Sequence, residues 1–218
     1  MRELEHLSRR EELIATGRRM NASGLNQGTS GNLSARVEGG FLVTPTGMEY
    51  EGLRPEDLVL MRFDGSHEGP RRPSSEWHFH RDILAARPEV NAVLHAHSMF
   101  STTLACLRRP IPAFHYMVAM AGGTSIRCAP YATFGTEELS RHAVAALEGR
   151  KACLLANHGL ITVGAGLAGA FKLAVEVETL AAMYLRALQV GEPVLLDEAQ
   201  MAVVLEKFKT YGQQKDGE

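Results

Sequence analysis

The 218-residue sequence has little net charge, few cysteines and no long apolar run. Its 23 basic side chains nearly balance 25 acidic ones, and the resulting net charge of -2 argues against binding of nucleic acid or acidic membranes through a broad basic surface. The three cysteines, Cys106, Cys128 and Cys153, form no CxxC pair. They therefore indicate reduced thiols rather than a disulfide framework.

Targeting segments and linkers are lacking as well. The N-terminus is charged where a secretory signal would have an apolar core, and no run approaches the roughly 18 apolar residues of a membrane span. We therefore expect a cytoplasmic protein. Because the chain has no repeat or low-complexity segment and a length typical of one domain, we expect residues 1–218 to form a single domain.

What the sequence does contain is an interleaved series of helix and strand patterns. Periodic or capped segments predict helices over 3–23, 77–87, 98–107, 137–147 and 167–188, and apolar runs predict strands over 33–37, 41–44, 58–63, 90–97, 152–156 and 160–163. Turns at Gly39–Gly40 and Asn157–Gly159 join two pairs of strands as hairpins. The pattern predicts an α/β fold with a largely antiparallel sheet covered by helices.

Nine histidines are many for so short a chain, and three of them could share a site. His95 and His97 lie two apart on a predicted strand, so their side chains leave the same face and can point at one metal ion. His158, beside Gly159, can project past the sheet edge from its hairpin turn. Three imidazoles with open coordination positions are typical of catalytic zinc, although the spacing also fits half-exposed strand histidines.

The remaining histidines have plainer interpretations. His78 and His80 follow Glu76 on a predicted helix, where surface or packing roles are expected, and the single tryptophan, Trp77, is expected in the core. His115 could line an interface or cap a turn, and both interpretations stay open. Solvated positions are expected for the histidines in polar surroundings, His6, His67 and His142.

The segment Pro73–Glu76 precedes a predicted helix and has two interpretations. Ser74 and Ser75 could cap the helix, with Glu76 stabilised by the helix dipole. Alternatively, Glu76 is an acid/base group, and free N–H groups with two hydroxyls form a seat for a phosphate. The glycine-rich loop at 24–32 and the Thr46–Gly47 turn could add donors around the same anion, although the loop lacks the lysine of a Walker motif.

Several blocks, in order along the chain, resemble the class II aldolase/adducin family, and most closely its L-fuculose-1-phosphate aldolases. They are GLNQGTSGNLSAR, VTPTGMEYEGL, PSSEWHFH, AVLHAHS, IPAFHYM, CAPYATFGT, NHGLI and VVLEKFKTYG, and the similarity runs from about residue 5 to 212. The resemblance implies a three-layer fold and a zinc-dependent lyase. Its implied reaction is the reversible cleavage of L-fuculose 1-phosphate to dihydroxyacetone phosphate and L-lactaldehyde through a metal-stabilised ene-diolate.

The resemblance also implies roles for individual residues. His95, His97 and His158 match the zinc ligands. Glu76 matches a glutamate that ligates the resting metal, moves aside for substrate, and exchanges a proton at the carbon next to the carbonyl. The implied phosphate seat consists of Asn32, Thr46, Gly47, Ser74 and Ser75.

Further implied residues lie on the aldehyde side and between subunits. Tyr116 matches a tyrosine that reaches the neighbouring subunit's site and exchanges a proton with the aldehyde oxygen. Phe134 and Tyr211 match an aldehyde-side wall and a mobile C-terminal tail, which we expect from about residue 207. Family members of this type are four-fold symmetric homotetramers with sites at subunit interfaces.

Other activities within and outside the family remain alternatives. A related L-ribulose-5-phosphate 4-epimerase is disfavoured because it has an aspartate where this chain has Glu76, and a methylthioribulose-1-phosphate dehydratase has a similar metal and carboxylate set. An adducin-like scaffold would lack the ligands that are present here, and a bicupin-like metal protein would lack the long helices. Cobalt or manganese could replace zinc.

Overall fold

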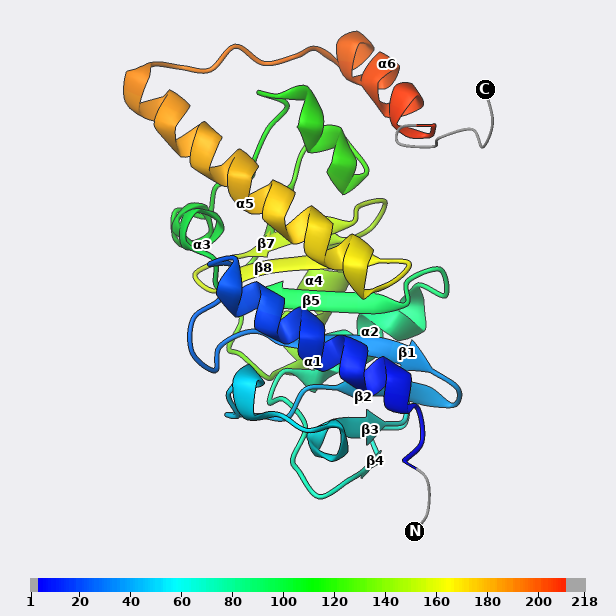
Figure 1. Ribbon diagram of the computed structural model, residues 1–218. Helices are drawn as coiled ribbons and strands as arrows, with labels where there is room; N and C mark the ends of the chain where they lie inside the picture. Colours follow the sequence, from blue (N-terminus) through cyan, green and yellow to red (C-terminus); the bar gives the residue numbers. More distant parts are fainter. Residues whose placement is uncertain (1–3, 211–218) are drawn as a thin grey trace, which may run out of the picture.

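One eight-stranded mixed sheet forms the centre of the computed structural model, which describes residues 4–210 (Figure 1). The strand order is β4-β3-β2-β1-β5-β8-β7-β6. The strands are β1 Asn32–Val37, β2 Gly40–Val43, β3 Val59–Met61, β4 His67–Glu68, β5 Ala92–Ala96, β6 Arg127–Ala129, β7 Ala152–Leu155 and β8 Gly159–Gly164. Neighbours pair antiparallel except β6 and β7, which are parallel, so the predicted largely antiparallel sheet is confirmed.

Helices cover both faces of this sheet. They are α1 Leu7–Ala22, α2 Trp77–Ala86, α3 Met99–Cys106, α4 Glu137–Ala146, α5 Leu167–Val190 and α6 Glu198–Phe208, with short 3-10 turns at η1 Tyr50–Gly52, η2 Pro55–Asp57 and η3 Tyr116–Ala121. Helices α1 and α5 cross one face, and α2 and α4 lie behind the other (Figure 1). The predicted three-layer α/β fold is therefore confirmed. No helix in the described part of the chain is long and apolar enough to cross a membrane.

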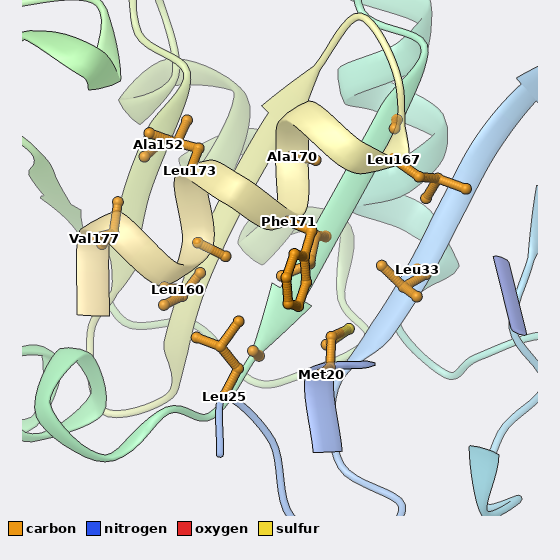
Figure 2. Close-up of a cluster of buried hydrophobic side chains, with 14 of the residues drawn as sticks. Met20, Leu25, Leu33, Ala152, Leu160, Leu167, Ala170, Phe171, Leu173 and Val177 are labelled. Atoms are coloured by element: carbon orange, nitrogen blue, oxygen red, sulfur yellow. The ribbon is translucent and has the colours of Figure 1, made fainter. Parts of the chain in front are cut away.

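The two faces of the sheet bury separate apolar cores. Figure 2 shows part of the first, in which Met20 of α1 and Phe171 of α5 pack beside Leu33 of β1. Along β5, Leu94 belongs to this first core, whereas Val93 faces the second core, under α2 and α4. Because strand side chains alternate, His95 leaves the same face as Val93 and lies at the edge of the second core.

Several elements differ from the expectations. The first helix begins at Leu7 rather than residue 3, and β4, β6 and η3 were not expected because such short segments show no clear periodicity. Helix α6 ends at Phe208, and beyond residue 210 the tail that we expected from about residue 207 lies outside the described residues. Tyr211 lies outside the described residues. Trp77 is half-buried and packs against the second core, so it lies at the margin of the expected interior.

Candidate active site

The candidate site forms where three neighbouring strands meet one end of a helix. Asn32, the first residue of β1, pairs with His95 near the end of β5. In the next strand pair Ala96 opposes Leu160 of β8, so the turn before β8, which carries His158, lies at the same end of the sheet. Glu76 stands immediately before α2. The antiparallel register therefore gathers residues that are far apart in the sequence.

The three predicted histidine ligands converge on one point. One ligand nitrogen from each of His95, His97 and His158 lies within 4.8 Å of the others. The Nε2 atoms of His95 and His97 are 3.0 Å apart, so the shared strand face predicted from their spacing is confirmed. His95 Nδ1 lies 2.9 Å from the backbone oxygen of Leu160, a contact that selects the tautomer with a lone pair on Nε2.

Electrostatics keeps the innermost imidazole in its metal-binding form. His95 is completely buried, and desolvation by burial lowers its pKa to about 3 despite the nearby Glu76 carboxylate. A neutral imidazole with an unprotonated nitrogen is the form that binds a metal ion. At neutral pH the site thus needs no proton loss at His95 before it can accept a cation.

The Glu76 carboxylate faces the histidines from across the site. Its Oε1 lies 3.1 Å from His158 Nε2 and its Oε2 lies 3.3 Å from His95 Nε2, while the Asn32 amide donates to Oε2 at 2.9 Å. Burial by itself would raise the pKa of Glu76, but the two imidazoles and Asn32 more than offset it and hold the pKa of the carboxyl below its usual range. The buried side chain is therefore a carboxylate.

This arrangement fits a divalent metal ion. Apart from the His158 imidazole, Glu76 Oε1 has no hydrogen-bond donor among residues 4–210, although it is buried. A buried anion facing three imidazoles is costly unless a cation accompanies it. Imidazole nitrogens with an adjacent carboxylate oxygen are a donor set that zinc and related divalent ions prefer. The three histidines thus form a site suited to a divalent metal ion, in agreement with what the resemblance implied.

A cavity of about 340 Å³ opens beside the histidines. It is lined by Glu76, His97, His158 and Phe134. It is also lined by all five residues predicted for the phosphate seat, Asn32, Thr46, Gly47, Ser74 and Ser75. Three separate segments thus bring hydroxyl, amide and glycine positions to one wall. The cavity therefore combines a polar wall with the metal site.

The contacts of Ser74, Ser75 and Glu76 at the start of α2 distinguish a helix cap from a functional site. Glu76 occupies the N-cap position, but its side chain makes no capping hydrogen bond and turns toward the histidines instead. Ser74 is buried, and its hydroxyl accepts from the Glu76 backbone N–H at 3.2 Å, whereas Ser75 is exposed at the cavity. Only Ser74 therefore has the cap-like contact that the local sequence suggested.

One predicted residue in the described part of the chain is not brought to this site. Tyr116 begins η3 and is 49% exposed, and it is absent from the cavity lining. Tyr211 lies outside the described residues. His115, for which two roles stayed open, accepts from the Met117 backbone N–H at 3.3 Å and so caps η3.

The site contains other residues that were not predicted from the sequence. Tyr131 and Asn157 line the cavity, and Asn157 adopts a left-handed backbone with φ of 56° in the turn before His158. Asparagine tolerates that conformation better than most residues, which is a signal the turn sequence offered. His80 was expected to be a surface or packing residue, and it is fully buried between Asn32 and Ser34.

Comparisons with known proteins agree with this geometry. Residues 11–185 match the family model described as Class II Aldolase and Adducin N-terminal domain. A 5-methylthioribulose-1-phosphate/5-deoxyribulose-1-phosphate aldolase from Rhodospirillum rubrum is 62% identical over 203 residues, which cover 93% of this chain and 92% of that protein. An L-fuculose phosphate aldolase from Escherichia coli is 53% identical over 202 residues, which cover 92% of this chain and 94% of that protein.

A solved structure has the same fold. It is described as L-fuculose 1-phosphate aldolase, and it superposes with a TM-score of 0.92 at 41% identity, covering 96% of this chain and all of that one. The family match spans most of the chain. The three candidate metal-binding histidines of the chain lie within the matched residues and meet in one site. The chain therefore belongs to the class II aldolase and adducin N-terminal domain family.

Proposed function

We propose that this protein is a metal-dependent lyase that reversibly cleaves a ketose 1-phosphate to dihydroxyacetone phosphate and a short aldehyde. The observation that carries the proposal is the Glu76 carboxylate, which lies buried against His95 and His158 beside a cavity with a polar wall. Cleavage of the C3–C4 bond needs stabilisation of negative charge, a proton at C3 and a grip on the phosphate. The site offers a group for each need.

The cleavage assigns the following tasks to residues of this chain. A divalent ion held by His95, His97 and His158 would supply Lewis-acid stabilisation of the negative charge that develops on the substrate. In the synthetic direction the Glu76 carboxylate removes a proton from C3 of dihydroxyacetone phosphate. In cleavage Glu76 receives the proton that leaves the C4 hydroxyl and returns it to C3 once the C3–C4 bond has broken. Tyr116 of a neighbouring subunit relays this proton from the C4 hydroxyl, whose oxygen becomes the aldehyde oxygen.

The polar wall of the cavity binds the other end of the substrate. Asn32, Thr46, Gly47, Ser74 and Ser75 present amide, hydroxyl and backbone groups without a lysine or arginine. Backbone N–H groups and hydroxyls of this kind can hold a phosphate. A phosphate fixed there orients the reacting carbons and lowers the entropic cost of the reaction.

Two kinds of sugar phosphate within this class are supported as substrates by the relatives of the chain. L-Fuculose 1-phosphate, our expectation from the sequence, is supported by the name of the 53% identical relative, and the pentulose 1-phosphates are supported by the name of the 62% identical relative. These sugars share a phosphate at C1 and end in a methyl or methylthio group. Phe134 and Tyr131, 65% and 52% exposed at the cavity, offer an apolar surface for such an end. We therefore propose 1-phosphoketoses with an apolar terminus as the substrate class.

The proposal extends to the metal and the assembly. Zinc is the ion we propose, because nitrogen donors from histidine with a carboxylate oxygen suit it. We infer a homotetramer of single-domain chains with sites at the interfaces, because Tyr116 is exposed and does not line the cavity of its own chain.

A product analysis tests the proposed function. The zinc-loaded protein is incubated separately with L-fuculose 1-phosphate, 5-deoxyribulose 1-phosphate, L-rhamnulose 1-phosphate and L-ribulose 5-phosphate, and the products are identified. Dihydroxyacetone phosphate from either of the first two is the expected result, and the ratio of their kcat/KM values assigns the preferred sugar. D-Xylulose 5-phosphate from the last sugar, without dihydroxyacetone phosphate from the others, would make the protein an epimerase.

A further inference from the structure

His80 is a fully buried polar residue that the proposed chemistry does not use. It lies on α2, four residues after Glu76, which stands at the N-cap of the same helix. Its Nδ1 is 2.7 Å from the Ser34 hydroxyl and its Nε2 is 2.5 Å from Asn32 Oδ1. Asn32 and Ser34 stand two apart on β1 and therefore face α2 together.

The direction of each hydrogen bond follows from the carboxylate at the end of the series. A carboxylate only accepts, so the side-chain nitrogen of Asn32 faces Glu76 and its Oδ1 faces His80. His80 Nε2 must then donate to Oδ1, and the neutral ring accepts from the Ser34 hydroxyl at Nδ1. Ser34, His80, Asn32 and Glu76 form one polarised series with consistent donors and acceptors.

We propose that His80 is a positioning residue that locks the Asn32 amide with its nitrogen toward Glu76, an inference that rests on the proposed function. Without this lock the amide can turn over and place Oδ1 against the carboxylate, which repels it. The amide holds Glu76 Oε2 at 2.9 Å, so its orientation determines where the carboxylate stands relative to the histidines. His80 thus acts on the proton transfer at Glu76 through Asn32, without contact with substrate or metal.

Substitutions at His80 separate this role from simple packing. His80→Leu fills the space but removes both hydrogen bonds, and it is expected to lower kcat roughly 10- to 100-fold, as is usual when the partner of an active-site ligand is lost. KM for the ketose phosphate should change much less. His80→Gln keeps an N–H donor for Asn32 Oδ1 and should regain most of the lost kcat.

His78→Gln is the matched control on the same helix. Its imidazole stacks on Trp77, and among the described residues its Nδ1 has no hydrogen-bond partner. This variant should keep the kcat of the natural protein. The inference is overturned if folded His80→Leu, verified by circular dichroism, has the kcat of His78→Gln, or if His80→Gln is no better than His80→Leu.

A double-mutant cycle tests the coupling through Asn32. Because His80 acts only by way of the Asn32 amide, the kcat of Asn32→Ala with His80→Leu should match that of Asn32→Ala alone within about a factor of two. If the fold-loss in kcat of the double variant equals the product of the losses in the two single variants, His80 does not act through Asn32, and the inference is contradicted. If His80→Leu does not fold, Ser34→Ala replaces it, because this variant removes only the hydroxyl that bonds His80 Nδ1. It should lower kcat less than Asn32→Ala does.

Histidine tautomers give a readout that does not depend on turnover. In the protein labelled with 15N-histidine and kept free of metal, His80 should show a protonated Nε2 and an unprotonated Nδ1 at neutral pH. A protonated Nδ1 would overturn the inference. If the natural protein cleaves no 1-phosphoketose, the proposed function fails, while the tautomer still decides whether the hydrogen-bonded series exists.

Discussion

At the scale of single residues, Glu76 shows how the fold resolves an ambiguous local sequence. Before a helix, a glutamate is commonly a dipole-stabilising group, and the residues around it do not distinguish that role from chemistry. In the structure its carboxylate lies 3.1 Å from His158 Nε2 and makes no capping bond. The histidines that surround Glu76 in the fold, rather than its neighbours in the sequence, therefore distinguish it from a helix-capping glutamate.

Removal of the Glu76 charge tests its proposed role. Glu76→Gln keeps the shape of the side chain but loses the acid/base group, so we expect kcat to fall roughly 100- to 10,000-fold. Circular dichroism should show the same fold, since the substitution leaves a group that can still occupy the space. Steady-state kinetics of ketose phosphate cleavage gives the measurement, and near-normal kcat would remove Glu76 from the role.

Part of the site could be predicted from residue spacing and part could not. The two-residue interval between His95 and His97 predicted their common face because strand side chains alternate. His158 follows His97 by more than sixty residues, and only the pairing of β5 with β8 brings them together. The interval of four residues between Glu76 and His80 did not predict that both contact Asn32, because the sequence does not show which strand faces the helix.

At the scale of elements, the turn before β1 places Asn32 opposite His95. Gly31 has φ of +73°, and a Cβ at this position would lie 2.8 Å from the backbone oxygen of His95. Glycine alone accepts both the left-handed backbone and the close approach. This residue therefore lets β1 begin directly beside the metal-binding strand.

Alanine at two glycines separates these effects. Gly28 has a similar φ of +60° with nothing close to its missing Cβ, so Gly28→Ala should cost only the backbone strain, about 1–2 kcal/mol. Gly31→Ala should lower the free energy of unfolding further and weaken metal binding, because strand β1 must move away from His95. Urea denaturation of both variants is the measurement. Equal losses would show that the close approach does not matter.

Asp57 ties the η2 turn to the segment that leads into the site. Its Oδ1 accepts from Arg71 at 2.8 Å and its Oδ2 accepts from the Arg54 backbone N–H at 3.0 Å. Burial by itself would raise the pKa of Asp57, but these donors more than offset it and hold the pKa below its usual range. The carboxylate therefore stabilises the fold above the ordinary aspartate pKa, and this contribution is lost as pH falls through and below that range.

Asp57→Asn tests this linkage. We expect the variant to lose about 2 kcal/mol of stability at pH 7, as is typical when a hydrogen-bonded charge is removed. The difference from the natural protein should shrink at pH 3, below the ordinary aspartate pKa, because the unfolded chain then binds a proton that the folded Asp57 resists. Denaturant unfolding at both values measures it, and a difference independent of pH would contradict the argument.

The larger elements were predictable for a physical reason that does not extend to the smaller ones. Helices such as α4 and α5 and strands such as β8 bury one or both faces, and burial imposes a periodicity on the sequence. By contrast, β4 has two exposed residues, and its pairing with β3 leaves no such pattern. Helix α6 is anchored mainly through the buried Met201, against Ala113 and Ala119, so its own sequence carries a weak signal.

At the scale of the whole molecule, the proposed role of Tyr116 requires a second chain. Tyr116 is exposed on η3 and does not line the cavity that contains Glu76. The α6 helix packs against this segment, with Met201 beside Ala119 of η3. A neighbouring subunit in the proposed homotetramer would place its tyrosine where the aldehyde leaves.

Hybrid tetramers test whether subunits share sites. Glu76→Gln and Tyr116→Phe chains should each have low activity alone, but a mixed tetramer contains some sites with both natural residues. We expect the mixture, after subunit exchange, to exceed both parents in kcat per chain. Native mass spectrometry confirms that mixed tetramers form. Mixed tetramers without any gain in activity would place Tyr116 outside the neighbouring site.

We propose that Glu76, beside a metal held by His95, His97 and His158, transfers a proton at the carbon next to the substrate carbonyl. Proton NMR of dihydroxyacetone phosphate in D₂O tests it without a need to know the aldehyde. The zinc-loaded protein should exchange one hydrogen at C3 for deuterium, and this exchange should be lost both on chelation and in Glu76→Gln. Absence of exchange with the zinc-loaded protein, or an unchanged rate in Glu76→Gln, would contradict the claim.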